Sequence, residues 1–218
     1  MNRYGMNPKP DIKSLYAVTP DCEDTKDLLW RSRLVLSGGT QVLQYRNKTA
    51  DAALRLKQAT SLRELTREFA VKFIVNDDAQ LAKQVDADGV HLGAMDGDLK
   101  AARTLLGRNK IIGISCYNLL SLARDAVATG ADYVAFGAFF PSTVKPDSVM
   151  ADVALLRQAR AELDVPLVAI GGITLQNASV LLDAGADALA VISALYNAAD
   201  CQAAAQEFSK LFIQDFAS

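Results

Sequence analysis

Residues 130–137 read Gly130-Ala131-Asp132-Tyr133-Val134-Ala135-Phe136-Gly137, a glycine-led turn followed directly by an apolar run. The same turn recurs at residues 185–187, before the apolar run 189–193, and a variant of it precedes the run 89–93. Glycine readily closes a helix in the left-handed conformation, and aspartate stabilises the turn that follows. The recurrence predicts repeated helix-to-strand units. We interpret their aspartates, Asp88, Asp132 and Asp187, as structural residues.

Working outward from this segment, short apolar runs alternate with longer amphipathic stretches along the whole chain. The apolar runs are residues 15–19, 42–46, 73–76, 89–93, 111–115, 133–137, 167–171 and 189–193. Nearly continuous apolar strands alternating with helices are typical of a parallel sheet covered by helices. Eight such units in this length predict an α/β fold of one domain, a (β/α)8 TIM barrel over residues 14–218 after a short N-terminal arm, residues 1–13.

Composition narrows the function classes. The formal net charge is -2 and the pI is near 5.4, which disfavours nucleic acid as the main partner. No apolar run is long enough for a membrane span, and the first residues lack the apolar core of a secretory signal. Cys22, Cys116 and Cys201 lack metal or redox spacing, so we expect a reduced, cytoplasmic setting. The single histidine, His91, excludes a multi-histidine metal site, and we interpret it as a barrel residue whose hydrogen bonds are satisfied.

Three polar side chains at the end of the second strand are the strongest functional signal. Gln44, Arg46 and Lys48 are two residues apart, and alternate residues of a strand share one face. Clustered cations are costly unless an anion binds between them. The pattern predicts an anionic ligand such as a phosphate or diphosphate, although a solvated strand end would carry the same residue types.

Carboxylates follow the next two strands. Asp77 ends the third strand and Asp96 follows the fourth, so both are expected at the carboxyl edge of the barrel. Mg²⁺ often binds through one or two carboxylates together with substrate phosphates. The pair therefore predicts a magnesium site. The adjacent Asp78 directly precedes a helical pattern and is the better candidate for a helix cap.

A second anion site is expected at the ends of the seventh and eighth strands. Gly171-Gly172 and Ile192-Ser193 end these strands, where many barrels bind phosphate through backbone N–H groups. Glycine permits close approach of the backbone to an anion. Two anion sites in one barrel would suit a transferase that joins two phosphorylated substrates.

Taken together, these segments resemble the thiamine phosphate synthase family over about residues 15–196. The motifs that carry the resemblance, in order, are residues 44–48, 73–78, 87–93, 130–134, 169–174 and 191–194. The resemblance implies condensation of 4-amino-2-methyl-5-hydroxymethylpyrimidine diphosphate with a thiazole phosphate, releasing diphosphate. The family chemistry is dissociative: diphosphate leaves first, and the thiazole nitrogen then attacks a methylene cation.

The resemblance also implies roles for individual residues. It assigns Asp77 and Asp96 to one Mg²⁺ per site, and Arg46, Lys48, Ser115 and Lys145 to catalysis. The implied substrate-binding set is Gln44, Tyr45, Arg46, Asn47, Lys48, Asn76, Ser115, Ser142, Thr143, Val144, Lys145, Gly172, Ile192 and Ser193. One position departs from the family, because Val144 stands where a second threonine usually precedes the lysine.

Two other interpretations remain open from the sequence. A thiazole tautomerase on the same barrel would rely on acid–base chemistry, for which His91 is the candidate. A non-catalytic sensor would bind a phosphorylated ligand without turnover. The sequence also leaves open whether the chain acts alone or as a homo-oligomer.

Overall fold

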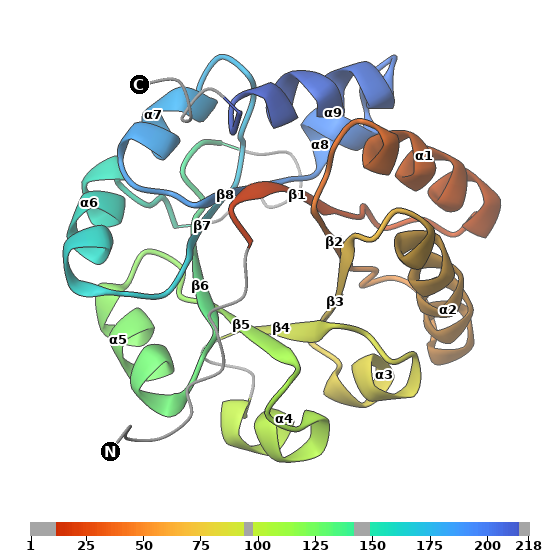
Figure 1. The fold of residues 1–218 in the computed structure, drawn as a ribbon, viewed down its shortest axis with the longest axis horizontal. Helices are drawn as coiled ribbons and strands as arrows, with labels where there is room; N and C mark the ends of the chain where they lie inside the picture. The colour runs from red at the N-terminus through yellow and green to blue at the C-terminus, as the bar shows by residue number, and fades with distance from the viewer. Residues whose placement is uncertain (1–11, 94–97, 142–148, 214–218) are drawn as a thin grey trace.

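The structure is a computed structural model that describes residues 12–93, 98–141 and 149–213. In this part of the chain, parallel strands pair in the order β1 to β8, and β8 pairs with β1 to close a barrel. Helices lie around the ring of strands (Figure 1). The predicted (β/α)8 barrel is therefore confirmed, and each apolar run of the sequence forms one of its strands.

The elements have the following bounds. The strands are β1 (Ser14–Val18), β2 (Val42–Tyr45), β3 (Lys72–Asn76), β4 (Gly89–Gly93), β5 (Ile111–Ser115), β6 (Tyr133–Phe136), β7 (Leu167–Ile170) and β8 (Ala188–Val191). The helices are α1 (Thr25–Ser37), α2 (Ala52–Glu68), α3 (Ala79–Gln84), α4 (Leu99–Leu106), α5 (Leu120–Thr129), α6 (Val153–Glu162), α7 (Ala178–Asp183), α8 (Ser193–Tyr196) and α9 (Cys201–Lys210). The proposed division at residue 14 stays a prediction, although β1 does begin there.

Two apolar layers stabilise the barrel because successive strand residues face opposite sides. Side chains such as Leu43 and Val75 pack outward against the helices. Their neighbours Val42 and Ile74 pack inside the barrel in a separate cluster that includes Tyr133. The barrel interior is thus filled near its middle, which leaves the strand ends to form a site.

Aspartates begin most of the helices. Asp24, Asp51, Asp78, Asp98 and Asp200 each accept a hydrogen bond from a backbone N–H in the first turn of the helix that follows. Such caps satisfy donors that the helix itself leaves without partners. The cap role expected for Asp78 is confirmed.

The recurring aspartates form three equivalent clamps at the amino ends of the strands. Asp187 Oδ2 accepts from Leu167 N at 2.8 Å and from Arg160 Nη1 at 2.7 Å. Asp132 and Asp88 repeat this arrangement with Arg103 and Arg63. Each clamp joins the turn before one strand to the preceding strand and to a helix, so the structural interpretation of these aspartates is confirmed.

Two remaining observations concern the helix lengths and the cysteines. Among the described residues, no helix is long and apolar enough to cross a membrane. Cys22, Cys116 and Cys201 are all free thiols.

Candidate active site

A cavity of about 570 Å³ opens at the carboxyl ends of the strands and extends into the barrel. This volume is in the range of small-molecule sites. We call it the main pocket. The predicted site residues that line it are Gln44, Arg46, Lys48, Asn76, Asp77, Ser115 and Ile192. The structure therefore brings together side chains from β2, β3, β5 and β8 that are far apart in the sequence.

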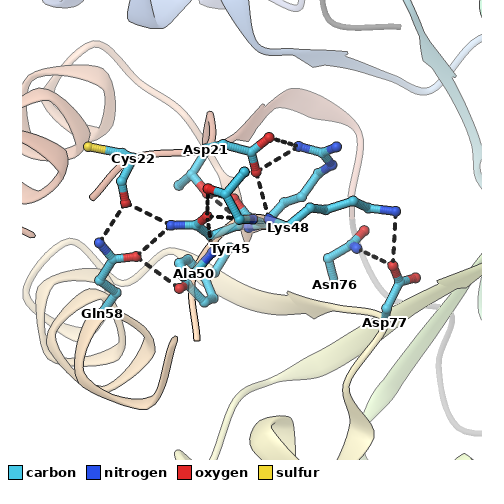
Figure 2. A network of polar contacts seen from close by, with 12 residues as sticks. Asp21, Cys22, Tyr45, Lys48, Ala50, Gln58, Asn76 and Asp77 are labelled. Atoms are coloured by element: carbon cyan, nitrogen blue, oxygen red, sulfur yellow. Dashed lines mark hydrogen bonds and ion pairs between the residues drawn. The ribbon is translucent and has the colours of Figure 1, made fainter. Parts of the chain in front are cut away.

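The end of β2 is held to the loop that follows β1. Thr19 Oγ1 accepts from Arg46 N at 2.8 Å and donates to Arg46 O at 2.9 Å. Asp21 accepts from Lys48 N at 2.7 Å, and its two carboxylate oxygens lie 3.2 and 3.3 Å from Arg46 Nη1. Figure 2 shows Asp21 hydrogen-bonded to the backbone of Lys48. The loop after β1 thus orients the guanidinium and the lysine backbone toward the main pocket.

Tyr45 and Asn47 face away from these cations, as alternation along a strand requires. Tyr45 Oη donates to Gln58 Oε1 at 2.9 Å, and Asn47 Nδ2 donates to Cys22 O at 2.7 Å (Figure 2). Burial raises the pKa of Tyr45 to about 12. Both residues line a neighbouring cavity of about 210 Å³ instead of the main pocket. Their contacts support the loop that carries Lys48, and their predicted contact with substrate stays a prediction.

Asp77 lies at the pocket wall in a left-handed conformation, with φ of 61°. Its N–H donates to His91 O at 2.8 Å, which ties the end of β3 to β4. Asp77 Oδ2 accepts from Asn76 Nδ2 at 2.7 Å and lies 3.6 Å from Lys48 Nζ (Figure 2). The carboxylate is half exposed, so it can still bind a cation or approach a ligand.

The predicted second anion site is only partly described. Ile192 and Gly171 line the main pocket, but Gly172 and Ser193 are not among its lining residues. Gly172 has φ of 63°, and a Cβ there would lie 2.5 Å from Phe140 O, so only glycine fits. The remaining predicted residues, Asp96, Ser142, Thr143, Val144 and Lys145, lie outside the described residues.

Two groups of residues at the site escaped the sequence reasoning. Asp21, which contacts Arg46 and Lys48, could have been found, since it follows the first strand just as Lys48 follows the second. Tyr16 and Tyr133 line the main pocket, but inside apolar strands they resemble ordinary core residues. His91 joins them there and hydrogen-bonds Tyr133, which confirms its interpretation as a satisfied barrel histidine.

Fold and site together define a (β/α)8-barrel enzyme whose pocket suits an anionic small molecule. The family model described as thiamine monophosphate synthase matches residues 15–195. A thiamine-phosphate synthase of Methylobacillus flagellatus is 57% identical over 97% of this chain and all of its own length. The corresponding protein of Nitrosomonas eutropha is 51% identical over 92% of this chain and 95% of its own.

A solved structure is similar as well. Thiamine phosphate pyrophosphorylase from Pyrococcus furiosus is 34% identical, with a TM-score of 0.83 over 95% of this chain and 98% of its own. The chain belongs to the thiamine monophosphate synthase family. Its function is thiamine-phosphate synthesis, and it is a transferase. The comparisons give no support to a tautomerase or a sensor.

Proposed function

We propose that the chain joins 4-amino-2-methyl-5-hydroxymethylpyrimidine diphosphate to 4-methyl-5-(2-phosphoethyl)thiazole, or to its carboxylated form, and releases diphosphate. With the carboxylated form, the thiazole carboxylate would leave as CO₂. The observation that carries this proposal is the convergence of Arg46 and Lys48 with Asn76 and Asp77 on one pocket wall. Two cations, an amide and a carboxylate suit a diphosphate that binds with a metal ion.

The residues present fit a magnesium ion. Asp77 offers a half-exposed carboxylate, which is a hard oxygen ligand of the kind that Mg²⁺ prefers. It lies beside the residues that are proposed to bind diphosphate. With Asp96 it would hold one Mg²⁺ per site. When bound, the ion would neutralise charge on the diphosphate oxygens.

The protein's part in the reaction is to stabilise the leaving group and to hold the two rings. The bond between the methylene carbon and the diphosphate oxygen breaks first, and the electron pair leaves with diphosphate. Arg46, Lys48 and Ser115, together with Lys145, stabilise the negative charge that develops there. The thiazole nitrogen then forms the new bond to the methylene carbon. Because diphosphate leaves first and the thiazole nitrogen is the attacking atom, no activated protein nucleophile is needed.

The thiazole phosphate is proposed to bind near the ends of β7 and β8. Ile192 at the pocket wall and the tight Gly171-Gly172 turn support this placement. Ser142, Thr143, Val144, Gly172 and Ser193 complete the proposed set. Substrates of this kind, together with free thiols, are consistent with a cytoplasmic enzyme.

Reconstitution tests the proposal directly. The purified chain is mixed with both phosphorylated substrates and Mg²⁺, and thiamine phosphate and diphosphate are measured. We expect both products in equal amounts and none after chelation of the metal. Binding of the pyrimidine diphosphate without any product would contradict the proposal and favour a sensor. Conversion of a thiazole phosphate alone to an isomer would favour a tautomerase.

A further inference from the structure

A chain of three hydrogen bonds crosses the barrel interior, next to the residues that are proposed to bind diphosphate. Gln44 Nε2 donates to Tyr16 Oη at 2.9 Å, Tyr16 Oη lies 2.8 Å from Tyr133 Oη, and Tyr133 Oη lies 2.9 Å from His91 Nδ1. The four residues come from β2, β1, β6 and β4. All are buried, and all line the main pocket.

All hydrogen bonds in this chain can donate in one direction, from Gln44 toward His91. Burial raises the pKa of both phenols above its usual value, so each keeps its single hydrogen. Tyr16 Oη accepts from the amide, which leaves its own hydrogen for Tyr133 Oη. The hydrogen of Tyr133 then goes to His91 Nδ1. In this direction Nδ1 of the neutral imidazole accepts, so its proton is on Nε2. If the oxygen and nitrogen of the Gln44 carboxamide exchanged places, every bond would reverse and the proton would be on Nδ1.

The barrel is built to hold Tyr133 in this place. Gly113 on β5 leaves room for its ring, because a Cβ at that position would lie 1.9 Å from a ring carbon. The imidazole of His91 stacks on the same ring, with centroids 5.5 Å apart. The ring of Tyr16 meets it edge-on at 6.1 Å. The ring of Tyr133, and with it the position of its hydroxyl, is therefore held from three sides.

We propose that Tyr16, Tyr133 and His91 are positioning residues that fix the orientation of the Gln44 carboxamide, so that its Oε1 faces the ligand as a hydrogen-bond acceptor. The inference deepens the proposed function and depends on it, since the ligand is a pyrimidine with a ring amino group. An amide oxygen accepts from that amino group and repels a ring oxygen at the same place. The chain of hydrogen bonds would thus select a 4-amino ring over a 4-oxo ring.

The first test measures ring selectivity. Values of kcat/KM are determined for the 4-amino and the 4-oxo pyrimidine diphosphates with the thiazole phosphate in excess. We expect the wild-type preference for the amino ring to fall about tenfold or more in Tyr16→Phe and in Tyr133→Phe, with KM for the thiazole phosphate unchanged. An unchanged ratio in either folded variant would overturn the inference.

A double variant separates positioning from direct contact with the substrate. If Tyr16 acts through Gln44, Tyr16→Phe added to Gln44→Ala changes the ratio no further. Multiplying effects would contradict the assignment. Tyr196→Phe is the matched control, because its phenol is equally buried and bonds to Ser32 Oγ outside the pocket lining. It should keep the wild-type ratio, and an equal loss there would attribute the effect to general packing.

A spectroscopic test needs no turnover. His91 is the only histidine in the sequence, so its ring nitrogens can be assigned without ambiguity in ¹⁵N-labelled protein. In mildly alkaline buffer we expect the tautomer protonated on Nε2, with Nδ1 accepting, and a shift of tautomer population in Tyr133→Phe. A neutral ring protonated on Nδ1 would overturn the inference. If the wild-type protein forms no product, the proposed function is wrong. The tautomer of His91 can still be measured in that case, because the measurement needs no turnover.

Discussion

The two rims of the barrel carry the same kinds of charged residue, but these residues are paired more closely at one rim than at the other. At the amino ends of the strands, Asp187 meets Arg160 at 2.7 Å and also accepts a backbone N–H. At the carboxyl ends, Arg46 lies 3.2 Å from Asp21, and Lys48 lies 3.6 Å from Asp77. Charged groups at the amino rim have close partners within the protein, whereas those at the carboxyl rim have longer contacts and can still bind a ligand.

The difference shows that residue type alone does not identify a functional charge. An aspartate that already accepts from an arginine and a backbone N–H has little left to offer a substrate. A half-exposed aspartate beside a loosely held lysine can exchange that partner for a metal or a phosphate. In a parallel barrel this division follows the strand direction, since ligands bind at the carboxyl ends. Three predictions test this division, and a fourth tests the burial of a thiol next to the pocket.

The largest effect is expected at Asp77. Asn keeps the size of the side chain and tolerates the left-handed backbone at this position, but it removes the charge. Asp77→Asn should abolish Mg²⁺-dependent synthesis without changing the melting temperature. The measurement is the rate of thiamine phosphate formation across a magnesium titration.

The neighbouring Asp78→Asn is the matched control. Asn caps a helix about as well as Asp does, so both activity and stability should stay near wild type. Wild-type-like activity in Asp77→Asn would sink the metal assignment. Equal losses in the two variants would show that the loop, and not the charge, had been changed.

The second comparison places one arginine change at each rim. Arg46→Gln should lower kcat/KM by roughly 10²–10³ at unchanged stability, because it removes a donor from the leaving diphosphate. Arg160→Gln should lower the free energy of unfolding by about 2 kcal/mol and leave kcat of the folded enzyme intact. Steady-state kinetics and urea unfolding of both variants measure the two effects. The reverse pattern would break the comparison.

A smaller effect is expected at Asp21, which orients Arg46 without reaching the ligand in our proposal. Asp21→Asn should reduce kcat/KM for the pyrimidine diphosphate about tenfold, because the guanidinium loses its charged partner. Asp24→Asn changes an exposed cap in the same loop and serves as the control. If both variants keep wild-type kinetics, Asp21 has no orienting role.

The smallest effect concerns Cys116, which follows the pocket residue Ser115 but is fully buried. Burial raises the pKa of the Cys116 thiol to about 12, whereas an unfolded thiol ionises near about pH 8.5. The native state therefore holds one more proton above that pH, and stability falls as pH rises toward 12. Cys116→Ala should flatten the decline in unfolding free energy from pH 8.5 upward, as measured in urea. The same slope in both proteins would contradict this.

Much of the site could be predicted from the sequence because strand alternation is a local property, and because successive strands usually lie next to each other in a parallel barrel. Gln44, Arg46 and Lys48 do share one pocket wall, and Asp78 does cap α3. The same rule explains why Tyr45 and Asn47 turn to the other side. Asp21 carries the same local signal, since it stands three residues after β1 just as Lys48 stands three residues after β2.

The amino-acid sequence alone establishes the repeated local units: the apolar strands, the cap at Asp78 and the turns at Asp88, Asp132 and Asp187. These depend on neighbours within a few residues. Only the tertiary structure decided which side chains meet across the barrel, such as Tyr16 and Tyr133, which are 117 residues apart. Their hydrogen bond exists because closure of the barrel brings distant strands together, whereas the clamp between Asp187 and Arg160 needs only the pairing of β7 with β8. No local pattern records that closure, so partners across the barrel had to be found in the fold.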